Sequence, residues 1–134
     1  MSFFISQEKF KAYIIENYSE INFDETKTVI VISTVNINPI INCLYVDKTF
    51  FFAARYHSAL DYFSDNFCLQ ANQIKRMYLV DKLLSTKLII ETNVILINQT
   101  NLTLKMNLPK LNFTPWHMRN LKLLRLKLSF NNGS

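Results

Sequence analysis

Few residues in this chain are of the types that carry out catalysis, and their spacing does not group them. It has two histidines, His57 and His117, and two cysteines, Cys43 and Cys68, all in separate segments. A metal site needs clustered His, Cys or carboxylate ligands, and the chain contains neither a CxxC nor an HExxH motif. A glycine-rich phosphate loop is impossible, because the only glycine is Gly133.

The best arrangement for nucleophilic catalysis is Ser58 beside His57 and Asp61 on one predicted helix. Neighbours at i and i+1 of a helix do not face each other, so this set predicts no active site, and His57 is expected at the surface or half-buried. Two carboxylate pairs are typical of solvated charges: Asp24/Glu25 and Asp61/Asp65. Both cysteines are expected to be buried free thiols. We therefore expect no catalytic residue, metal site, bound cofactor or small-molecule ligand.

The elements that carry these residues can be read from apolar spacing and β-branched content. Helices are predicted at residues 6–18, 55–67 and 114–122, and strands at residues 27–35, 40–46, 49–54, 87–97 and 102–108. Residues 73–80 fit either a strand or a helix. Residues 124–130 alternate Leu with Arg, Lys and Ser, a strand pattern with a basic face, but a helix over 116–128 fits as well.

Local signals support several of these elements. Ser6 is placed to cap the first helix, and Thr114 followed by Pro115 is typical of a helix start. The second helix is predicted because four apolar residues would line one side of it: Tyr56, Leu60, Phe63 and Phe67. With a single glycine in the chain, Asn is expected at turns that need positive φ.

Together these elements predict an α+β fold. It would have an N-terminal helix, a mixed or antiparallel sheet with a long C-terminal hairpin, a second helix packed on the sheet and a short C-terminal helix. At 134 residues with 49% hydrophobic content, the chain is expected to form one domain over residues 1–130, with a disordered tail at 131–134. No apolar run approaches the roughly 20 residues of a membrane helix, and the N-terminus does not read as a signal or transit peptide.

Charge is distributed unevenly along the chain. Residues 1–91 hold all ten acids and nine bases, whereas residues 92–134 hold six bases and no acid. Such asymmetry indicates that the C-terminal part faces a negative partner or surface, unless it is only a solvated basic face. Trp and Arg are common anchors of protein interfaces. The candidate interface residues are therefore Trp116, Arg119, Lys122, Arg125 and Lys127.

The second half of the chain resembles a known family. Four segments carry the resemblance: LDYFSDN at 60–66 as a helix, MYLVD at 77–81 as a strand end, LIIETNVILINQTNLTLKMNLP at 88–109 as a hairpin, and WHMRNL at 116–121 as a helix. In this order and spacing they are similar to the small hydrophilic Q-module subunit of respiratory NADH:ubiquinone oxidoreductase, complex I, a family called the 30-kilodalton subunit that also has bacterial members. Trp116, Arg119 and Leu121 match the family's last helix, whereas Met118 and Asn120 replace its two glutamates, and its glycine- and proline-rich tail is absent.

The resemblance implies a shortened or split, non-catalytic subunit of the peripheral arm of complex I, one that binds no flavin and no iron–sulfur cluster. It would pack on the quinone-site subunit and support electron transfer from NADH to ubiquinone, on the matrix side of the mitochondrial inner membrane. The heavy use of Asn, Ile, Phe, Leu and Lys is typical of an AT-rich gene, which would also suit organelle encoding. Two other interpretations remain open. The same basic C-terminal third would suit an organellar ribosomal protein that binds rRNA, or the chain could be an adaptor-type binding domain.

Overall fold

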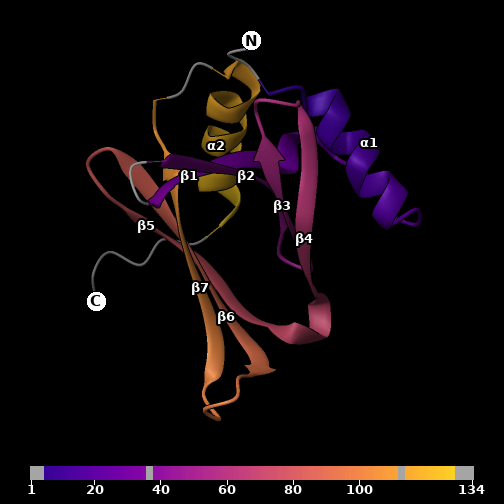
Figure 1. Ribbon diagram of the computed structural model, residues 1–134. Helices are drawn as coiled ribbons and strands as arrows, with labels where there is room; N and C mark the ends of the chain where they lie inside the picture. Colours follow the sequence, from indigo (N-terminus) through magenta and orange to yellow (C-terminus); the bar gives the residue numbers. More distant parts are fainter. Residues whose placement is uncertain (1–4, 36–37, 112–113, 129–134) are drawn as a thin grey trace.

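The computed structural model describes residues 5–35, 38–111 and 114–128. These form an α+β fold in which helices α1 and α2 flank two antiparallel sheets, as Figure 1 shows. Sheet A has the order β1-β2-β3-β4 and sheet B the order β5-β6-β7. The predicted α+β class is confirmed, but the strands divide between two sheets and the described residues contain two α-helices, not three.

Helix α1 (Gln7–Asn17) begins where the sequence predicts. The Ser6 hydroxyl accepts a hydrogen bond from the Lys9 N–H at 3.2 Å, which satisfies one of the free donors of the first turn. Phe10 and Ile14, one turn apart, are fully buried against sheet A. Phe10 meets Phe63 with ring centroids 5.3 Å apart, so α1 is held on the sheet mainly by aromatic packing.

Sheet A is a meander. After the 3-10 turn η1 (Glu25–Lys27) come β1 (Thr28–Val35), β2 (Asn38–Asp47), β3 (Phe50–His57) and β4 (Tyr62–Gln70). The predicted hairpin of β2 and β3 is confirmed, with Lys48 and Thr49 at its turn. Both faces of this sheet are covered, which explains why β2 and β3 read as nearly continuous apolar runs.

The predicted helix at residues 55–67 is wrong, because this segment is the end of β3, a turn and the first part of β4. Tyr56 and Phe63 are cross-strand partners with ring centroids 5.2 Å apart, and both are buried toward α1. Leu60, which the helical pattern needs on the same side, lies in the turn and is 76% exposed. A hairpin with a turn of this length places apolar residues at spacings that also fit a helix, and tertiary pairing decides between the two.

Positive φ is adopted by residue types other than the expected asparagine. Within the described ranges, the non-glycine residues in the left-handed region are Asp61, Asp65 and Gln99. Asp61 is held there because its carboxylate accepts hydrogen bonds from the Tyr56 hydroxyl, at 2.6 Å, and from the Lys9 ammonium of α1. The turn between β3 and β4 thus also ties down the first helix.

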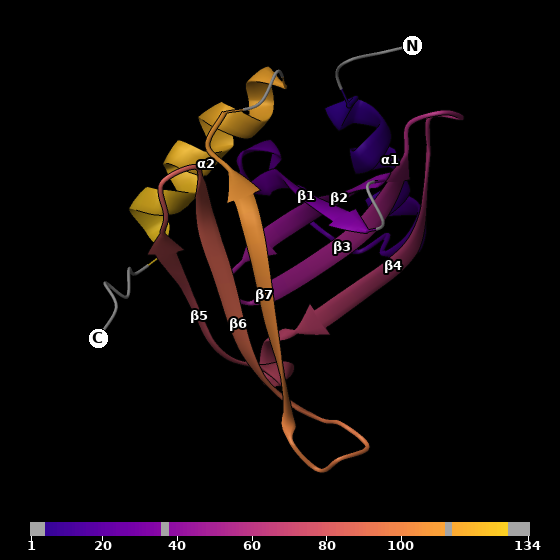
Figure 2. The same ribbon diagram turned by 60° about the vertical axis from the view of Figure 1, so that its left-hand side comes forward.

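Sheet B follows the short 3-10 turn η2 (Ala71–Gln73) and contains β5 (Ile74–Asp81), β6 (Ser85–Ile95) and β7 (Asn101–Pro109). The ambiguous segment 73–80 is therefore a strand. The long hairpin predicted over residues 87–108 is confirmed as β6 and β7. In Figures 1 and 2 its far end extends beyond the rest of the fold.

Helix α2 (Pro115–Lys127) starts at the predicted Thr114 cap position but runs five residues past the predicted end at 122. The helical alternative for 116–128 is correct, since Leu121, Leu124 and Leu128 are buried on one side, at the spacing of a helix face. The strand pattern fails at Leu126, which points outward with 84% of its side chain exposed. The last two residues of that pattern and the predicted disordered tail lie outside the described residues.

The two sheets meet where β1 lies against β7, and α2 packs on β1 at this junction. Figure 2 shows α1 and α2 on different sides of the strands. Between the sheets and α2 lies a central core, drawn from all seven strands and α2: Val29, Val31, Leu44, Val46, Phe51, Leu69, Leu79, Leu88, Ile90, Leu108, Leu121, Leu124 and Leu128. The other face of sheet A forms a second core with α1, and Trp116 of α2 belongs to this core as well.

Candidate functional site

The outward face of α2 carries the strongest concentration of exposed cations in the predicted interface. Pro115, Arg119, Lys122 and Leu126 are all exposed, and their spacing of four, three and four residues places them on one stripe of the helix. Neither Arg119 nor Lys122 forms an ion pair with any residue that the structure describes. We call these four residues the α2 stripe, and two of the five predicted interface residues belong to it.

Trp116, another of the predicted interface residues, is buried inside the protein. Its ring is buried in the second core, and the indole N–H donates to the backbone carbonyl of Ile5 at 2.9 Å. In this structure the tryptophan therefore connects α2 to Ile5, in the segment that precedes α1. The sequence shows a tryptophan next to a basic segment, but it does not show that the helix turns this position inward.

His117, which the sequence leaves without a role, joins three elements. The Ile30 N–H of β1 donates to His117 Nδ1 at 2.9 Å, and His117 Nε2 lies 2.7 Å from the Pro109 carbonyl at the end of β7. An N–H can only donate and a carbonyl can only accept, so the imidazole is neutral with its proton on Nε2. Burial lowers the pKa of His117 below its ordinary value, partly offset by the bond to Pro109.

Asn120 lies one turn further along the buried side of α2. Its amide nitrogen is within hydrogen-bond distance of the Glu25 carbonyl, at 2.7 Å, and of the Thr28 carbonyl, at 2.9 Å. The amide thereby ties α2 to η1 and the start of β1. Its Oδ1 atom is buried and has no hydrogen-bond partner within the described part of the chain. His117 and Asn120 together make α2 a fixed platform for its outer face.

The basic C-terminal segment is balanced in part by an acid from an earlier strand. The Asp81 carboxylate, at the end of β5, accepts hydrogen bonds from both terminal nitrogens of Arg125, at 2.9 and 3.2 Å. It also pairs with the Lys110 ammonium at 2.9 Å. Hydrogen bonds from Lys110 and Arg125 hold the pKa of Asp81 below its ordinary value. The charge count along the sequence misses this pairing, because Asp81 and Arg125 are 44 residues apart.

Lys127, the last of the predicted interface residues, is exposed at the end of α2. It lines a hollow of about 240 Å³ that also includes Lys27 and Lys48, while Asp47 pairs with Lys27 at 3.2 Å. Among the described residues Lys127 has no ion pair. It lies on a different part of the helix surface from Arg119 and Lys122.

Three exposed leucines form a feature that the sequence reasoning missed. Leu83 and Leu84 make the turn between β5 and β6 and are 89% and 74% exposed, and Leu111 is 78% exposed. The Lys110 N–H donates to the Leu84 carbonyl at 3.1 Å, which brings Leu111 beside this turn. We call Leu83, Leu84 and Leu111 the leucine patch. The ion pair between Asp81 and Arg125 joins β5, the strand that precedes the leucine patch, to α2. A Leu-Leu pair in the short connection between the predicted elements at 73–80 and 87–97 could have indicated it, because such connections are normally polar.

The residues considered for catalysis are not assembled for it. The His57 ring stacks on Tyr62 at 4.3 Å and contacts the Ser64 hydroxyl, while the Asp61 carboxylate faces Tyr56 and Lys9. Both cysteines are free thiols, as predicted, although Cys68 is half-buried. No group of three or more potential metal ligands occurs within the described ranges.

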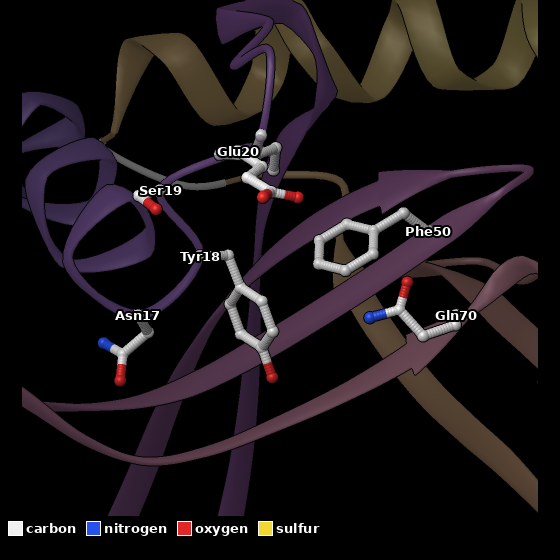
Figure 3. A pocket seen from close by; sticks show the side chains of 7 residues that line it. Asn17, Tyr18, Ser19, Glu20, Phe50 and Gln70 are labelled. Carbon is white, nitrogen blue, oxygen red and sulfur yellow. The ribbon is translucent and has the colours of Figure 1, made fainter.

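A hollow of about 460 Å³ lies where the end of α1 meets the start of β3 and the end of β4. Figure 3 shows Tyr18 and Phe50 facing it with Gln70 alongside, and the two rings make an edge contact at 5.7 Å. The Tyr18 hydroxyl lies 2.6 Å from the Cys68 sulfur, and this bond, with burial, raises the pKa of Tyr18 to about 12. The other lining residues are mostly exposed polar side chains, which do not form a set with a defined chemistry.

No α-helix in the described part of the chain is both long and apolar enough to cross a bilayer. Comparison with known proteins adds no assignment, since no family model, no curated protein and no solved structure matches the chain.

Proposed function

We propose that this protein is a non-catalytic structural subunit of the peripheral arm of mitochondrial NADH:ubiquinone oxidoreductase, on the matrix side of the inner membrane, where it packs on the quinone-site subunit. The observation that carries the proposal is the α2 stripe, in which Arg119 and Lys122 form no ion pair within the described part of the chain. The same helix is tied through Arg125 to β5, the strand that precedes the leucine patch. This combination is typical of a surface that a partner protein covers.

The leucine patch favours a protein partner on physical grounds. Single exposed apolar residues are common on soluble proteins, but three adjoining leucines at 74–89% exposure are not. Burying one leucine side chain stabilises a complex by about 2 kcal/mol, so covering the patch would contribute several kcal/mol. Arg119 and Lys122 of the α2 stripe would then provide orientation and specificity against acidic groups of the partner.

The family resemblance supplies the identity of the assembly. The β6–β7 hairpin and α2 have the secondary structure that the resemblance implies for residues 88–109 and 116–121, and β5 ends at the expected Asp81. Arg119, which matches an arginine in the family's last helix, is exposed on α2. The resemblance fails at residues 60–66, where the structure has a turn and a strand in place of the family's helix. Support therefore comes from the segment after residue 74.

The test is co-purification of a tagged chain from its native membranes in mild detergent. The proposal expects iron–sulfur and flavin subunits in the purified assembly, together with NADH oxidation. The variant Arg119→Glu/Lys122→Glu should recover about tenfold less of these subunits, while its thermal unfolding stays within a few degrees of the wild type, because both side chains are exposed. The control Lys48→Glu/Lys75→Glu makes the same charge change at exposed positions on β5 and the β2–β3 turn. Normal recovery of these subunits with the Arg119→Glu/Lys122→Glu variant would show that the α2 stripe is not the interface.

The alternative function is rRNA binding in an organellar ribosome, favoured by the exposed cations Arg119, Lys122 and Lys127. Phosphate contacts release counterions, so the affinity would fall steeply as salt rises, with a slope that scales with the number of phosphates contacted. Ribosomal proteins and rRNA in the purified assembly, lost between about 50 and 200 mM salt, would establish this alternative and refute the complex I assignment.

A further inference from the structure

The far end of the β6–β7 hairpin is closed by a hydrogen-bonded turn. The last cross-strand pair is Ile95 with Asn101, and beyond it the Leu96 N–H donates to the Thr100 carbonyl at 2.8 Å. The Gln99 N–H donates to the Leu96 carbonyl at 2.8 Å, with Gln99 at φ 66°. This is a three-residue hairpin loop with a left-handed last residue, a well-defined turn. We call residues 95–101 the hairpin tip.

The hairpin tip lies outside the cover of the other strands. The pairing of β5 with β6 ends at Ile74 and Thr92, and the Asn93 side chain donates to the carbonyl of Asn72 in η2 at 3.1 Å. Beyond Asn93 the hairpin continues alone, and Figures 1 and 2 show it projecting from the body of the protein in both views.

The composition of this projection is unusual for a surface loop. Ile95 and Ile97 are 69% and 103% exposed, and Leu96 between them is also exposed. Loop tips in contact with water are normally polar, yet here three consecutive aliphatic residues stand at the point furthest from the core. Their apolar surface would be buried only if another molecule covered it.

The absence of charged residues around the hairpin tip indicates which kind of molecule would cover it. Residues 92–104 contain no Asp, Glu, Lys or Arg. The nearest charged residues along the hairpin, Glu91 and Lys105, are six and eight residues from Ile97, roughly 20 Å along the strands. This exceeds the Debye length of about 8 Å at physiological ionic strength. The hairpin therefore offers no cation to a nucleic-acid or lipid phosphate at its tip, although both classes of binder normally depend on one.

The polar residues of the tip also favour a protein over a bilayer. The Asn98 side chain accepts hydrogen bonds from the N–H and hydroxyl of Thr100, at 3.2 and 2.6 Å. The remaining amide groups of Asn98, Gln99 and Asn101 would be carried into the acyl layer with Ile97, and each unpaired polar group there costs several kcal/mol. A protein cleft can instead offer hydrogen-bonding groups at its rim around an apolar floor.

We propose that the hairpin tip inserts into an uncharged, apolar cleft of a neighbouring protein subunit, with Ile95 and Ile97 as the buried anchors. The proposal rests on the proposed function only in that the chain is held by protein partners, and it does not depend on the identity of the assembly. The tip is a second contact, distinct from the α2 stripe and the leucine patch, which lie beside the opposite end of sheet B.

A photo-crosslinking experiment tests the proposal in the native assembly. The tagged full-length chain carries Ile97→p-benzoylphenylalanine, an apolar residue at a fully exposed position that should not disturb folding. Ultraviolet light should produce one discrete adduct with a single protein chain, which mass spectrometry of the adduct identifies. Adducts with lipid or RNA alone, or no adduct from a chain that is incorporated in the assembly, would overturn the proposal.

Charged variants provide a second readout with a matched control. The crosslink identifies the partner protein, and Ile97→Asp should reduce the amount of this partner that co-purifies with the chain by about tenfold. The reason is that a carboxylate would enter an apolar cleft. Leu60→Asp introduces the same charge at another highly exposed aliphatic residue, in the β3–β4 turn, and should leave recovery unchanged. Equal recovery with both variants, verified as folded by circular dichroism, would contradict docking of the tip.

The two proposals fail separately. A discrete protein adduct at position 97 in an assembly without complex I subunits would uphold the insertion of the tip and refute the proposed function. Complex I subunits that co-purify without any adduct would support the proposed function and refute the insertion.

Discussion

His117 is the residue whose structural role differs most from what its type suggests. A histidine in a binding protein is often a ligand or a proton donor, but here the ring links the β1 backbone to the end of β7 from inside α2. It has the buried, neutral form that those two partners require. Because the two sheets meet at β1 and β7, one side chain stabilises the junction on which the fold depends.

Replacing this histidine should both destabilise the protein and change its pH dependence. His117→Ala leaves the buried Ile30 N–H and the half-buried Pro109 carbonyl unpaired, so we expect a loss of about 3 kcal/mol in the free energy of unfolding at pH 7.5. The folded-state pKa lies below 6.5, so below pH 6.5 the unfolded chain binds a proton that the folded chain excludes. The wild type should therefore lose stability as the pH falls, by at most about 1.4 kcal/mol per pH unit for this group.

Urea unfolding at pH 7.5, 6.5 and 5.5 measures both effects. The pH-dependent loss should disappear in His117→Ala and persist in His57→Ala, which removes the other histidine from a half-buried position. If the loss persists in the first variant and disappears in the second, His117 is not the group responsible.

At the scale of elements, the turn between β3 and β4 explains why the helix predicted at residues 55–67 is wrong. Positions 56, 60, 63 and 67 fit a helix face, but the turn at Asp61 reverses the chain and brings Tyr56 opposite Phe63. Periodicity over a short window does not report a reversal, particularly where the turn contains neither Gly nor Pro. By contrast, the hairpin of β6 and β7 is predicted correctly because β7 alternates strictly between apolar and polar residues.

Glycine should be favoured at one left-handed position and not at another. Gln99→Gly removes the Cβ strain at φ 66° and should raise the free energy of unfolding by about 0.5–1 kcal/mol. Asp61→Gly should lower it, even though its φ is 55°, because the carboxylate that binds Tyr56 and Lys9 is lost. Chemical denaturation of the two variants gives opposite signs on this account, and destabilisation by Gln99→Gly would refute it.

At the scale of the whole molecule, exposed apolar residues gather at the two ends of sheet B. The leucine patch lies at the β5–β6 turn and the hairpin tip at the end of the β6–β7 hairpin, while the core between the sheets is well covered. The buried core stabilises the isolated chain, but it leaves the leucine patch and the hairpin tip exposed. On the two proposals above, partner proteins would cover both ends.

The isolated protein should therefore self-associate, and substitution at the leucine patch should reduce this. Leu83→Ser/Leu84→Ser replaces side chains that make little contact with the core, so the free energy of unfolding should change by less than about 0.5 kcal/mol. Light scattering over a concentration series should show a lower average mass for the variant than for the wild type. Identical association of the two proteins, or a large loss of stability, would contradict the exposure of the patch in solution.

The amino-acid pattern alone determined the α+β class, the first helix with its Ser6 cap, and the β2–β3 and β6–β7 hairpins, because these depend on local spacing and residue type. Only the tertiary structure decided that Trp116 turns inward, that Asp81 pairs with Arg125 and that the strands divide between two sheets. These features depend on contacts between residues 44 to 111 positions apart. A periodicity or a charge count along the chain contains no information about which distant residues meet, and packing of the two sheets and α2 around one core makes that choice.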